Sequence, residues 1–206
     1  ISEPDVSPLQ LQGPKSRDIM VKIFGNEIID LKYYWFKKFN HNGNELVISR
    51  TGWSSELGYE IFLMDSSYGN DLYNTIMDIG YPMGLRPGHT STIRRVEGGM
   101  LSYHADMTIN TNPLELGMEN FINLDKDFDF VGKNALIKIV EKGLLRKQVG
   151  IIIEDKPMSG PNTRFWDVIK DDIVIGKVTS AVYSPRLKQN IGLALIDIKY
   201  SDIDEK

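Results

Sequence analysis

The sequence predicts an α+β protein in which a mixed N-terminal region is followed by a smaller all-β module. Residues 6–142 alternate short β-rich runs with segments whose apolar side chains recur at helical spacing. From Arg146 onward, four β-rich runs follow one another with turns between them and no helical segment. The chain has 206 residues, 41% of them hydrophobic and 25% charged, which suffices for one large or two small domains. We therefore predict two domains, residues 1–145 and residues 146–206.

The first elements expected are a strand, a helix and an aromatic segment. Val6 to Gln12 is typical of a short buried strand, and Ser16 is the expected N-cap of a helix over residues 17–24. The segment 31–39 interleaves aromatic residues with lysines. Such a stretch can stack nucleobases, although a strand with alternating faces is the favoured interpretation. The turn residues His41-Asn42-Gly43-Asn44 then predict a hairpin.

The stretch from Arg50 to Phe62 is the most informative part of the chain. A strand is predicted over residues 45–50 and a second over residues 59–64. Gly52 and Gly58 are expected to give the turn between these strands its backbone freedom.

Glu60 is the main candidate for a functional residue. It lies in an apolar run, where a carboxylate is costly unless it is hydrogen-bonded or paired. Trp53 places a large flat surface nearby in sequence, so the two side chains would suit a flat, nitrogen-rich heterocycle. The alternative is a surface hairpin with Glu60 pointing outward, which strand alternation permits. The residues alone leave both interpretations open.

The remaining elements alternate until the β-rich module begins. Helices are predicted from the capping Asp65 to Ile79, over residues 90–101 and over residues 132–142, and a weakly alternating strand over residues 115–125. Arg95 either holds a ligand carboxylate by a bidentate fork or belongs to a solvated charged face. The β-rich runs cover residues 149–153, 165–169, 173–182 and 191–198.

Composition argues against several classes of function. A net charge of -4 and the lack of a Lys/Arg run argue against nucleic-acid binding. No apolar run approaches the roughly 18–20 residues of a membrane span. The chain has no cysteine, which removes thiolate chemistry and fits a cytoplasmic protein. Its 3 histidines lack metal-ligand spacing, so we predict no metal. Glycine-rich phosphate loops and nucleophile elbows are not found either.

Four stretches in a fixed order carry a resemblance to a known family. Residues 51–60, Thr-Gly-Trp-Ser-Ser-Glu-Leu-Gly-Tyr-Glu, are similar to the signature of the glycine-cleavage T-protein (aminomethyltransferase) superfamily. Residues 9–16, 95–103 and 112–117 resemble three further family segments. The resemblance implies a folate-binding aminomethyltransferase-like domain followed by a C-terminal antiparallel β-barrel. Family members extend beyond both ends, so we expect an internal fragment with a truncated barrel.

The resemblance also implies tetrahydrofolate as the cofactor. Glu60 then accepts N–H donors from the pterin edge, and Tyr59 and Arg95 are further cofactor-binding candidates. One-carbon transfer to tetrahydrofolate needs no covalent enzyme intermediate, because the protein acts by positioning the donor carbon and by electrostatics. The superfamily's proposed catalytic aspartate falls in the N-terminal part that this chain lacks, so no catalytic residue is named.

Within the superfamily, the sequence is most similar to the dimethylsulfoniopropionate demethylases. This similarity rests on residues 12–16, on Trp53 in place of the usual Tyr, and on residues 99–103. A sulfonium cation over the indole of Trp53 would form a cation–π contact. We therefore expect a small-molecule methyl donor, dimethylsulfoniopropionate, with Trp53, Phe62 and Tyr103 as substrate-binding candidates.

Besides the missing aspartate, the sequence departs from the family pattern in two places, and the first of these weakens an aminomethyltransferase assignment. Residues 84–91 lack the Arg-Asp pair that aminomethyltransferases carry, and Tyr103 is followed by His104 where the family has Gly. An aminomethyltransferase acting with a lipoyl carrier protein is the alternative enzyme. The third alternative is a non-catalytic folate-binding module; the superfamily's iron–sulfur assembly members carry a Cys-containing motif that this chain does not have.

Overall fold

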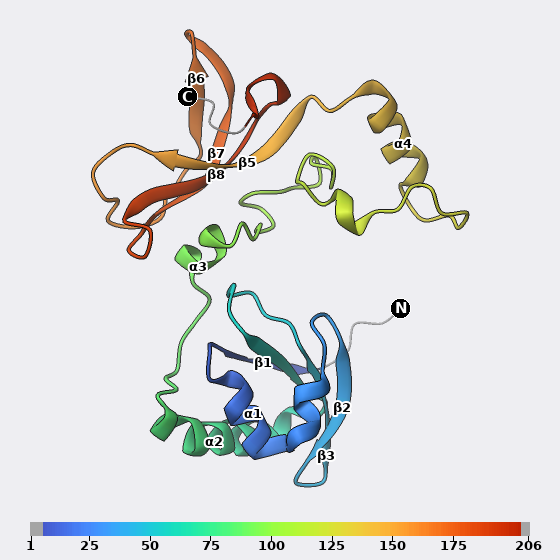
Figure 1. Ribbon diagram of the computed structural model, residues 1–206, viewed down its shortest axis with the longest axis vertical. Coiled ribbons are helices and arrows are strands. Elements are labelled where there is room, and N and C mark those ends of the chain that lie inside the picture. Colours follow the sequence, from blue (N-terminus) through green and yellow to red (C-terminus); the bar gives the residue numbers. More distant parts are fainter. Residues whose placement is uncertain (1–5, 203–206) are drawn as a thin grey trace. The chain divides into compact units, whose positions relative to one another are not determined.

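The computed structural model describes residues 6–202, which Figure 1 shows as a ribbon. The chain forms two compact units: unit 1 ends at Ser91, and unit 2 begins at Thr92. Each unit has its own four-stranded antiparallel sheet and its own helices. The predicted α+β class is therefore confirmed.

Unit 1 is built on a sheet in the order β1-β4-β3-β2. Its strands are β1 (Ser7–Gln12), β2 (Phe36–His41), β3 (Asn44–Ser49) and β4 (Gly58–Leu63). All pairings are antiparallel. The hairpin turn between β2 and β3 is confirmed, since Asn42 and Gly43 have φ of 51° and 86°, as a tight two-residue turn requires.

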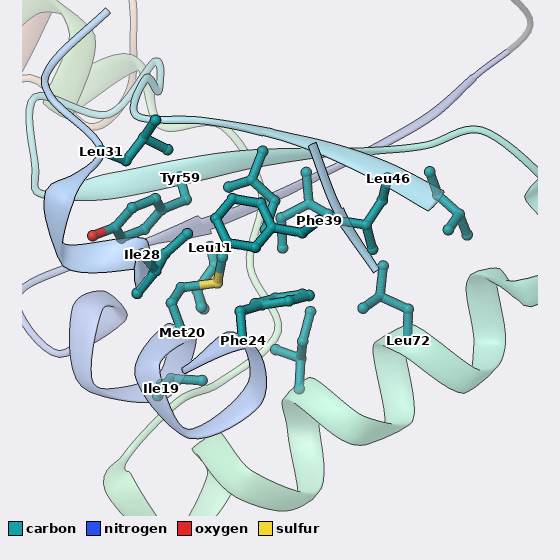
Figure 2. Close-up of a cluster of buried hydrophobic side chains, with 14 residues drawn as sticks. Leu11, Ile19, Met20, Phe24, Ile28, Leu31, Phe39, Leu46, Tyr59 and Leu72 are labelled. Atoms are coloured by element: carbon teal, nitrogen blue, oxygen red, sulfur yellow. The ribbon is translucent and has the colours of Figure 1, made fainter. Parts of the chain in front are cut away.

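One face of this sheet packs against the helices α1 (Ser16–Phe24) and α2 (Gly69–Gly80) (Figure 1). Short 3₁₀ turns over Asn26–Asp30, Ser66–Tyr68 and Tyr81–Met83 connect the larger elements. Figure 2 shows the resulting core, in which aromatic and aliphatic side chains from both layers meet. Its members are Leu11, Ile19, Met20, Phe24, Ile28, Leu31, Phe39, Leu46, Ile48, Tyr59, Ile61, Leu63, Leu72 and Ile76.

Strand β4 separates its side chains cleanly between the two faces of the sheet. Tyr59, Ile61 and Leu63 are buried in the core, whereas Glu60 and Phe62 are only partly buried. Because successive side chains of a strand point to opposite faces, Glu60 and Phe62 lie on the face directed away from the core.

Two predicted details of unit 1 are wrong. Ser16 is not the N-cap: it is the first residue of α1, and its hydroxyl donates instead to the Leu57 carbonyl at 3.0 Å. The segment 31–39 is a strand only from Phe36, because Trp35 N bonds to Lys32 O at 2.9 Å and closes a turn. Tyr34 in that turn has φ of 64°, which a strand does not allow.

Unit 2 contains the four C-terminal strands that the sequence predicts. They are β5 (Arg146–Ile153), β6 (Trp166–Lys170), β7 (Ile173–Ser184) and β8 (Gln189–Asp197), paired antiparallel in the order β5-β8-β7-β6. The pairing is irregular between Val178 and Ser180 in β7, where the register shifts. A sheet of this order, with β5 and β6 at its edges, is consistent with part of a barrel.

The two helices of unit 2 are α3 (Thr92–Glu97) and α4 (Lys133–Lys142). The α4 helix agrees with the prediction, but α3 stops well short of the predicted residue 101. Its end is set by Gly99, whose φ is 65°, and by the bond from Met100 N to Arg95 O at 2.8 Å.

The strand predicted over residues 115–125 is not present. Asn112 Oδ1 accepts bonds from the backbone N–H groups of Leu114 and Glu115, each at 3.0 Å, and so holds the chain in a turn. Gly117 follows with φ of 72°, and a 3₁₀ turn covers Glu119–Phe121. A side chain that bonds to its own local backbone has replaced the ladder that a strand would need.

The spatial division of the chain differs from the predicted boundary near residue 145. Val96 of α3 is buried against Val182 of β7 and against Ile191 and Leu193 of β8. Residues 92–145 therefore form one compact unit with the C-terminal sheet, and the division falls between Ser91 and Thr92. Sequence composition gave no sign of this, because the contact joins segments far apart in the chain.

Candidate functional site

The Glu60 carboxylate is held in place by side chains from β1 and from the segment that follows β3. In the register of the sheet, Glu60 pairs with Gln10 of β1 and with Ser49 of β3. Gln10 Nε2 donates to Glu60 Oε1 at 3.0 Å, and the Thr51 hydroxyl donates to Glu60 Oε2. The Ser49 hydroxyl in turn hydrogen-bonds to Thr51 Oγ1 at 2.5 Å. The carboxylate is thus oriented by a short chain of polar side chains.

Each Glu60 oxygen accepts one hydrogen bond from the part of the chain that the structure describes. A carboxylate oxygen has two lone pairs, so each retains capacity for one more donor. Glu60 is partly exposed, on the face of the sheet directed away from the core. Two oxygens oriented in this way can accept a pair of N–H donors from the edge of a flat ring.

The other candidates of unit 1 fall on both sides of the sheet. Phe62 lies two residues from Glu60 on the same face and is partly buried. Trp53 is partly buried in the turn that leads to β4. Tyr59 is only 1% exposed and belongs to the core, with the Arg50 guanidinium 5.3 Å from its ring centroid. Glu60 and Phe62 therefore share a face, whereas Tyr59 points the other way.

The turn before β4 is fastened to β1 by Gln12, which the sequence did not single out as a functional residue. Gln12 Nε2 donates to the carbonyls of Thr51 and Tyr59 at 3.3 and 3.2 Å. Its Oε1 accepts from the Ser54 hydroxyl at 2.6 Å. This one carboxamide therefore ties the end of β1 to both sides of the turn.

Gly52 and Gly58 leave space for the Gln12 carboxamide and do not have a positive φ, which corrects the expectation that they supply backbone freedom. Positive φ values occur elsewhere in the described chain, but at neither of these glycines. A Cβ at either position would lie 2.1 Å from Gln12 Oε1. The Gln12 carboxamide is packed against both glycines, and any larger residue there would displace it.

In unit 2, Arg95 takes part in a buried ion pair. Arg95 Nη1 donates to Asp106 Oδ2 at 2.7 Å, and Arg95 Nη2 donates to Ser180 Oγ at 2.8 Å. Asp106 also accepts from Ser180 Oγ at 2.6 Å, from Thr179 Oγ1 at 2.7 Å and from Ser102 N at 2.9 Å. The Asp106 side chain is 0% exposed and that of Arg95 is 8% exposed. Arg95 thus joins α3 to β7 and is not part of a solvated charged face.

A cavity of about 580 Å³ lies beside this ion pair, within the size range of small-molecule sites. It brings Arg95 together with Tyr103, two of the predicted ligand-binding residues. Tyr103 is 53% exposed and meets the ring of His104 at 4.4 Å between centroids. The other lining residues are Thr92, Ala105, Pro161, Asn162, Thr163, Arg164, Phe165, Thr179 and Ser180.

His104 explains one departure from the family pattern. Its φ is 70°, in the left-handed region that glycine adopts freely. The bond from His104 N to Met107 O at 2.8 Å holds the turn closed. The glycine-like backbone is therefore kept although the residue is His.

Within residues 6–202 no group of His, Cys, Asp and Glu side chains converges as metal ligands would. None of the helices described is both long and apolar enough to cross a membrane.

Comparison with known proteins places the chain in a family. The GCVT N-terminal domain model matches residues 2–126, and the glycine cleavage T-protein C-terminal barrel domain model matches residues 146–206. The chain belongs to the glycine-cleavage T-protein family. The start of the second match lies next to the predicted boundary at residue 145, although the compact units divide earlier.

Two curated members of this family illustrate the similarity. The chain is 36% identical over 197 residues to the dimethylsulfoniopropionate demethylase DmdA of Ruegeria pomeroyi, covering 96% of this chain and 53% of that protein. It is 38% identical over 203 residues to an aminomethyltransferase of Thermoanaerobacter pseudethanolicus, covering 97% of this chain and 54% of that protein. The chain thus spans about half the length of the curated relatives it matches.

A solved structure supports the fold. The glycine cleavage system aminomethyltransferase T from Bartonella henselae superimposes with a TM-score of 0.79 and 20% sequence identity. The superposition covers 98% of this chain and 56% of that chain. At this identity the likeness establishes the fold alone.

Proposed function

We propose that this chain forms part of a tetrahydrofolate-dependent one-carbon transferase, in which Glu60 binds the pterin ring. The observation that carries the proposal is the Glu60 carboxylate itself, fixed by Gln10 and Thr51 with one acceptor position left on each oxygen. The edge of a pterin presents adjacent N–H donors that match such an acceptor pair. Membership of the T-protein family agrees with this ligand.

The neighbouring residues fit the same group. Phe62 supplies an apolar surface beside Glu60, and Trp53 lies in the adjoining turn. Because Gln10 and Thr51 already hold the carboxylate, binding would freeze little additional side-chain freedom. Tetrahydrofolate, when bound, supplies the nitrogen that receives the one-carbon unit. The residues of this chain would bind and orient it, and we name no catalytic residue.

For the one-carbon donor we propose dimethylsulfoniopropionate, with Trp53 facing the sulfonium by a cation–π contact. Phe62 and Tyr103 remain proposed substrate-binding residues, and Tyr103 lines the cavity of unit 2. The similarity to a curated dimethylsulfoniopropionate demethylase supports this choice.

Aminomethyl transfer with a lipoyl carrier protein is the second candidate, since similarity to an aminomethyltransferase is as high. The absence of an Arg-Asp pair from residues 84–91, where aminomethyltransferases carry one, argues against aminomethyl transfer. Arg86 lies in this segment, 4.0 Å from the Tyr81 ring centroid, and its Nη1 donates to the Tyr81 carbonyl at 3.1 Å. A non-catalytic folate-binding module is the third candidate.

Calorimetric titration of tetrahydrofolate tests the pterin site, using the full-length protein and its Glu60→Gln variant. Gln keeps the size of the side chain but removes an ionised acceptor, so affinity should fall by about 10- to 100-fold. Glu45→Gln is the matched control, because Glu45 is an exposed carboxylate of the neighbouring strand β3, paired only with Lys38 among the described residues. Unchanged affinity in Glu60→Gln would refute the proposed site.

The donor is tested by product analysis on the same protein. Methyl transfer from dimethylsulfoniopropionate to N5 of tetrahydrofolate should yield 5-methyl-tetrahydrofolate, with the thioether methylthiopropionate as the leaving group and the N5 proton released. Trp53→Leu should lower this activity about tenfold. Methylene transfer from an aminomethyl-lipoyl carrier, without sulfonium activity, would favour the second candidate. Tetrahydrofolate binding with neither activity would favour the non-catalytic module.

A further inference from the structure

Gln12 occupies an unusual place at the end of β1. Its carboxamide makes three hydrogen bonds, all to residues 39 to 47 positions later in the chain. Nε2 donates to the carbonyls of Thr51 and Tyr59, and Oε1 accepts from the Ser54 hydroxyl. A glutamine that bonds to both ends of a turn fixes the distance between them.

The two glycines of the turn leave room for this side chain and for little else. A Cβ on Gly52 or on Gly58 would meet Gln12 Oε1 at 2.1 Å, far inside van der Waals contact. Neither glycine has a positive φ, so the backbone there would accept other residues. The spacing of these glycines is therefore matched to the Gln12 carboxamide.

Both segments held by Gln12 lead directly to the Glu60 carboxylate. The Thr51 carbonyl accepts from Gln12, while the Thr51 hydroxyl donates to Glu60 Oε2. The Tyr59 carbonyl also accepts from Gln12, and it belongs to the peptide bond that precedes Glu60. Gln12 itself does not bond to Glu60; it holds the backbone on both sides of it.

We infer that Gln12 is the positioning residue of the Glu60 site, which fixes Thr51 and β4 so that the carboxylate meets its ligand in one orientation. The inference rests on the proposed function, because the readout is pterin binding. Without the carboxamide, Thr51, Ser54 and Tyr59 each lose a hydrogen bond to the end of β1, and the Thr51–Glu60 bond loses its fixed geometry. A ligand would then have to order the site as it binds.

A double-mutant cycle tests the inference in the full-length protein, with tetrahydrofolate affinity as the readout. The four proteins are wild type, Gln12→Glu, Glu60→Gln and the double variant. Gln12→Glu keeps the size and the acceptor for Ser54 but removes both Nε2 donors, so affinity should fall on the order of tenfold. If Gln12 acts through Glu60, the same change should have almost no effect in the Glu60→Gln background.

An equal loss of affinity in both backgrounds would overturn the inference, because a purely structural role would not depend on Glu60. A loss in Glu60→Gln with none in Gln12→Glu would also overturn it, while leaving the proposed function intact. If Glu60→Gln binds like wild type, it is the proposed function that fails.

A milder variant keeps the test decisive if Gln12→Glu does not fold. Ser54→Ala removes only the hydroxyl that donates to Gln12 Oε1. It should weaken tetrahydrofolate binding by about threefold in wild type and by less in Glu60→Gln. Equal effects in the two backgrounds would count against the positioning role.

Discussion

The two units each contain a carboxylate held by hydroxyl groups, but the two carboxylates are completed in different ways. Asp106 in unit 2 accepts two hydrogen bonds on each oxygen: Thr179 and Ser180 on Oδ1, Arg95 and Ser102 on Oδ2. Glu60 in unit 1 accepts one on each, counted over the described residues. The Asp106 side chain is 0% exposed, whereas Glu60 is partly exposed.

This difference separates a structural carboxylate from a binding one. A carboxylate whose four lone pairs are filled has no acceptor left for a ligand, and a buried one opposite an arginine stabilises the fold only as a complete pair. A carboxylate that is oriented by one hydrogen bond on each oxygen still has two lone pairs that can accept bonds from a ligand. Residue type alone would not have distinguished Asp106 from Glu60, because both are acidic residues. In the folded chain both also accept hydrogen bonds from hydroxyl side chains.

The largest expected effect is on the stability of unit 2. Asp106→Asn removes the negative charge that the buried Arg95 guanidinium contacts at 2.7 Å, so the free energy of unfolding should fall by about 3–5 kcal/mol. Denaturant unfolding of the full-length protein measures it. Glu60→Gln, by contrast, should cost less than about 1 kcal/mol.

Asp125→Asn is the control for this pair, because Asp125 is an exposed aspartate of the same unit. It should leave the unfolding free energy within about 0.5 kcal/mol of wild type. If Asp106→Asn proved as mild as Asp125→Asn, the buried pair would not stabilise the fold, and the distinction between the two carboxylates would fail.

Hydroxyl removal gives a smaller and sharper comparison. Ser180→Ala removes the group that bonds to both Arg95 and Asp106, so we expect a loss of about 1.5–3 kcal/mol in unfolding free energy. Thr51→Val removes the donor to the partly exposed Glu60 and should cost about 0.5–1.5 kcal/mol.

Ligand affinity should rank these two variants in the reverse order. Thr51→Val should weaken tetrahydrofolate binding, because Glu60 loses one of the groups that orient it. Ser180→Ala should leave the Glu60 site unchanged. Titration of the same two proteins with tetrahydrofolate provides the check. If the variant that loses more unfolding free energy also loses more affinity, the proposed distinction between a structural and a binding carboxylate would be wrong.

The sequence predicted regular elements better than it predicted side-chain roles. Strands β5 to β8 were predictable because long β-branched runs separated by turns leave few alternatives. The Asn42-Gly43 hairpin follows from the φ values that only such residues adopt readily. Glu60 was detectable as a charge inside an apolar run.

The polar networks were beyond local pattern. Gln12 reaches Thr51 and Tyr59 across 39 and 47 positions, and Ser180 reaches Asp106 across 74. The short windows over which hydrophobic periodicity is read do not contain both ends of such a bond. Arg95 shows the consequence: local sequence left it between a ligand-binding residue and a solvated charge, whereas its bond to Ser180, 85 positions later, makes it part of a buried network with Asp106.

Asp65 extends the comparison to a fully exposed carboxylate, where the expected effect is smallest. It caps the turn before α2, and Ser67 N donates to its Oδ1 at 2.9 Å. Hydrogen bonds from the side chain and then the backbone of Ser67 lower the pKa of Asp65 below its usual value of 3.8. A carboxyl whose pKa is lower in the folded state stabilises the fold above its unfolded pKa, and that contribution disappears as the pH falls through the folded value.

Asp65→Asn should therefore be slightly less stable than wild type at pH 7, with the difference shrinking as the pH falls below the ordinary aspartate pKa of about 3.9 and vanishing below the folded-state pKa. Unfolding measured across this pH range tests it, with Asp78→Asn as the control for removing one exposed carboxylate. A difference that persisted in acid would mean that the cap acts through shape and not through charge. Asp65 would then not fit the comparison with Asp106 and Glu60, in which exposure and hydrogen bonding together decide what the charge of a carboxylate contributes.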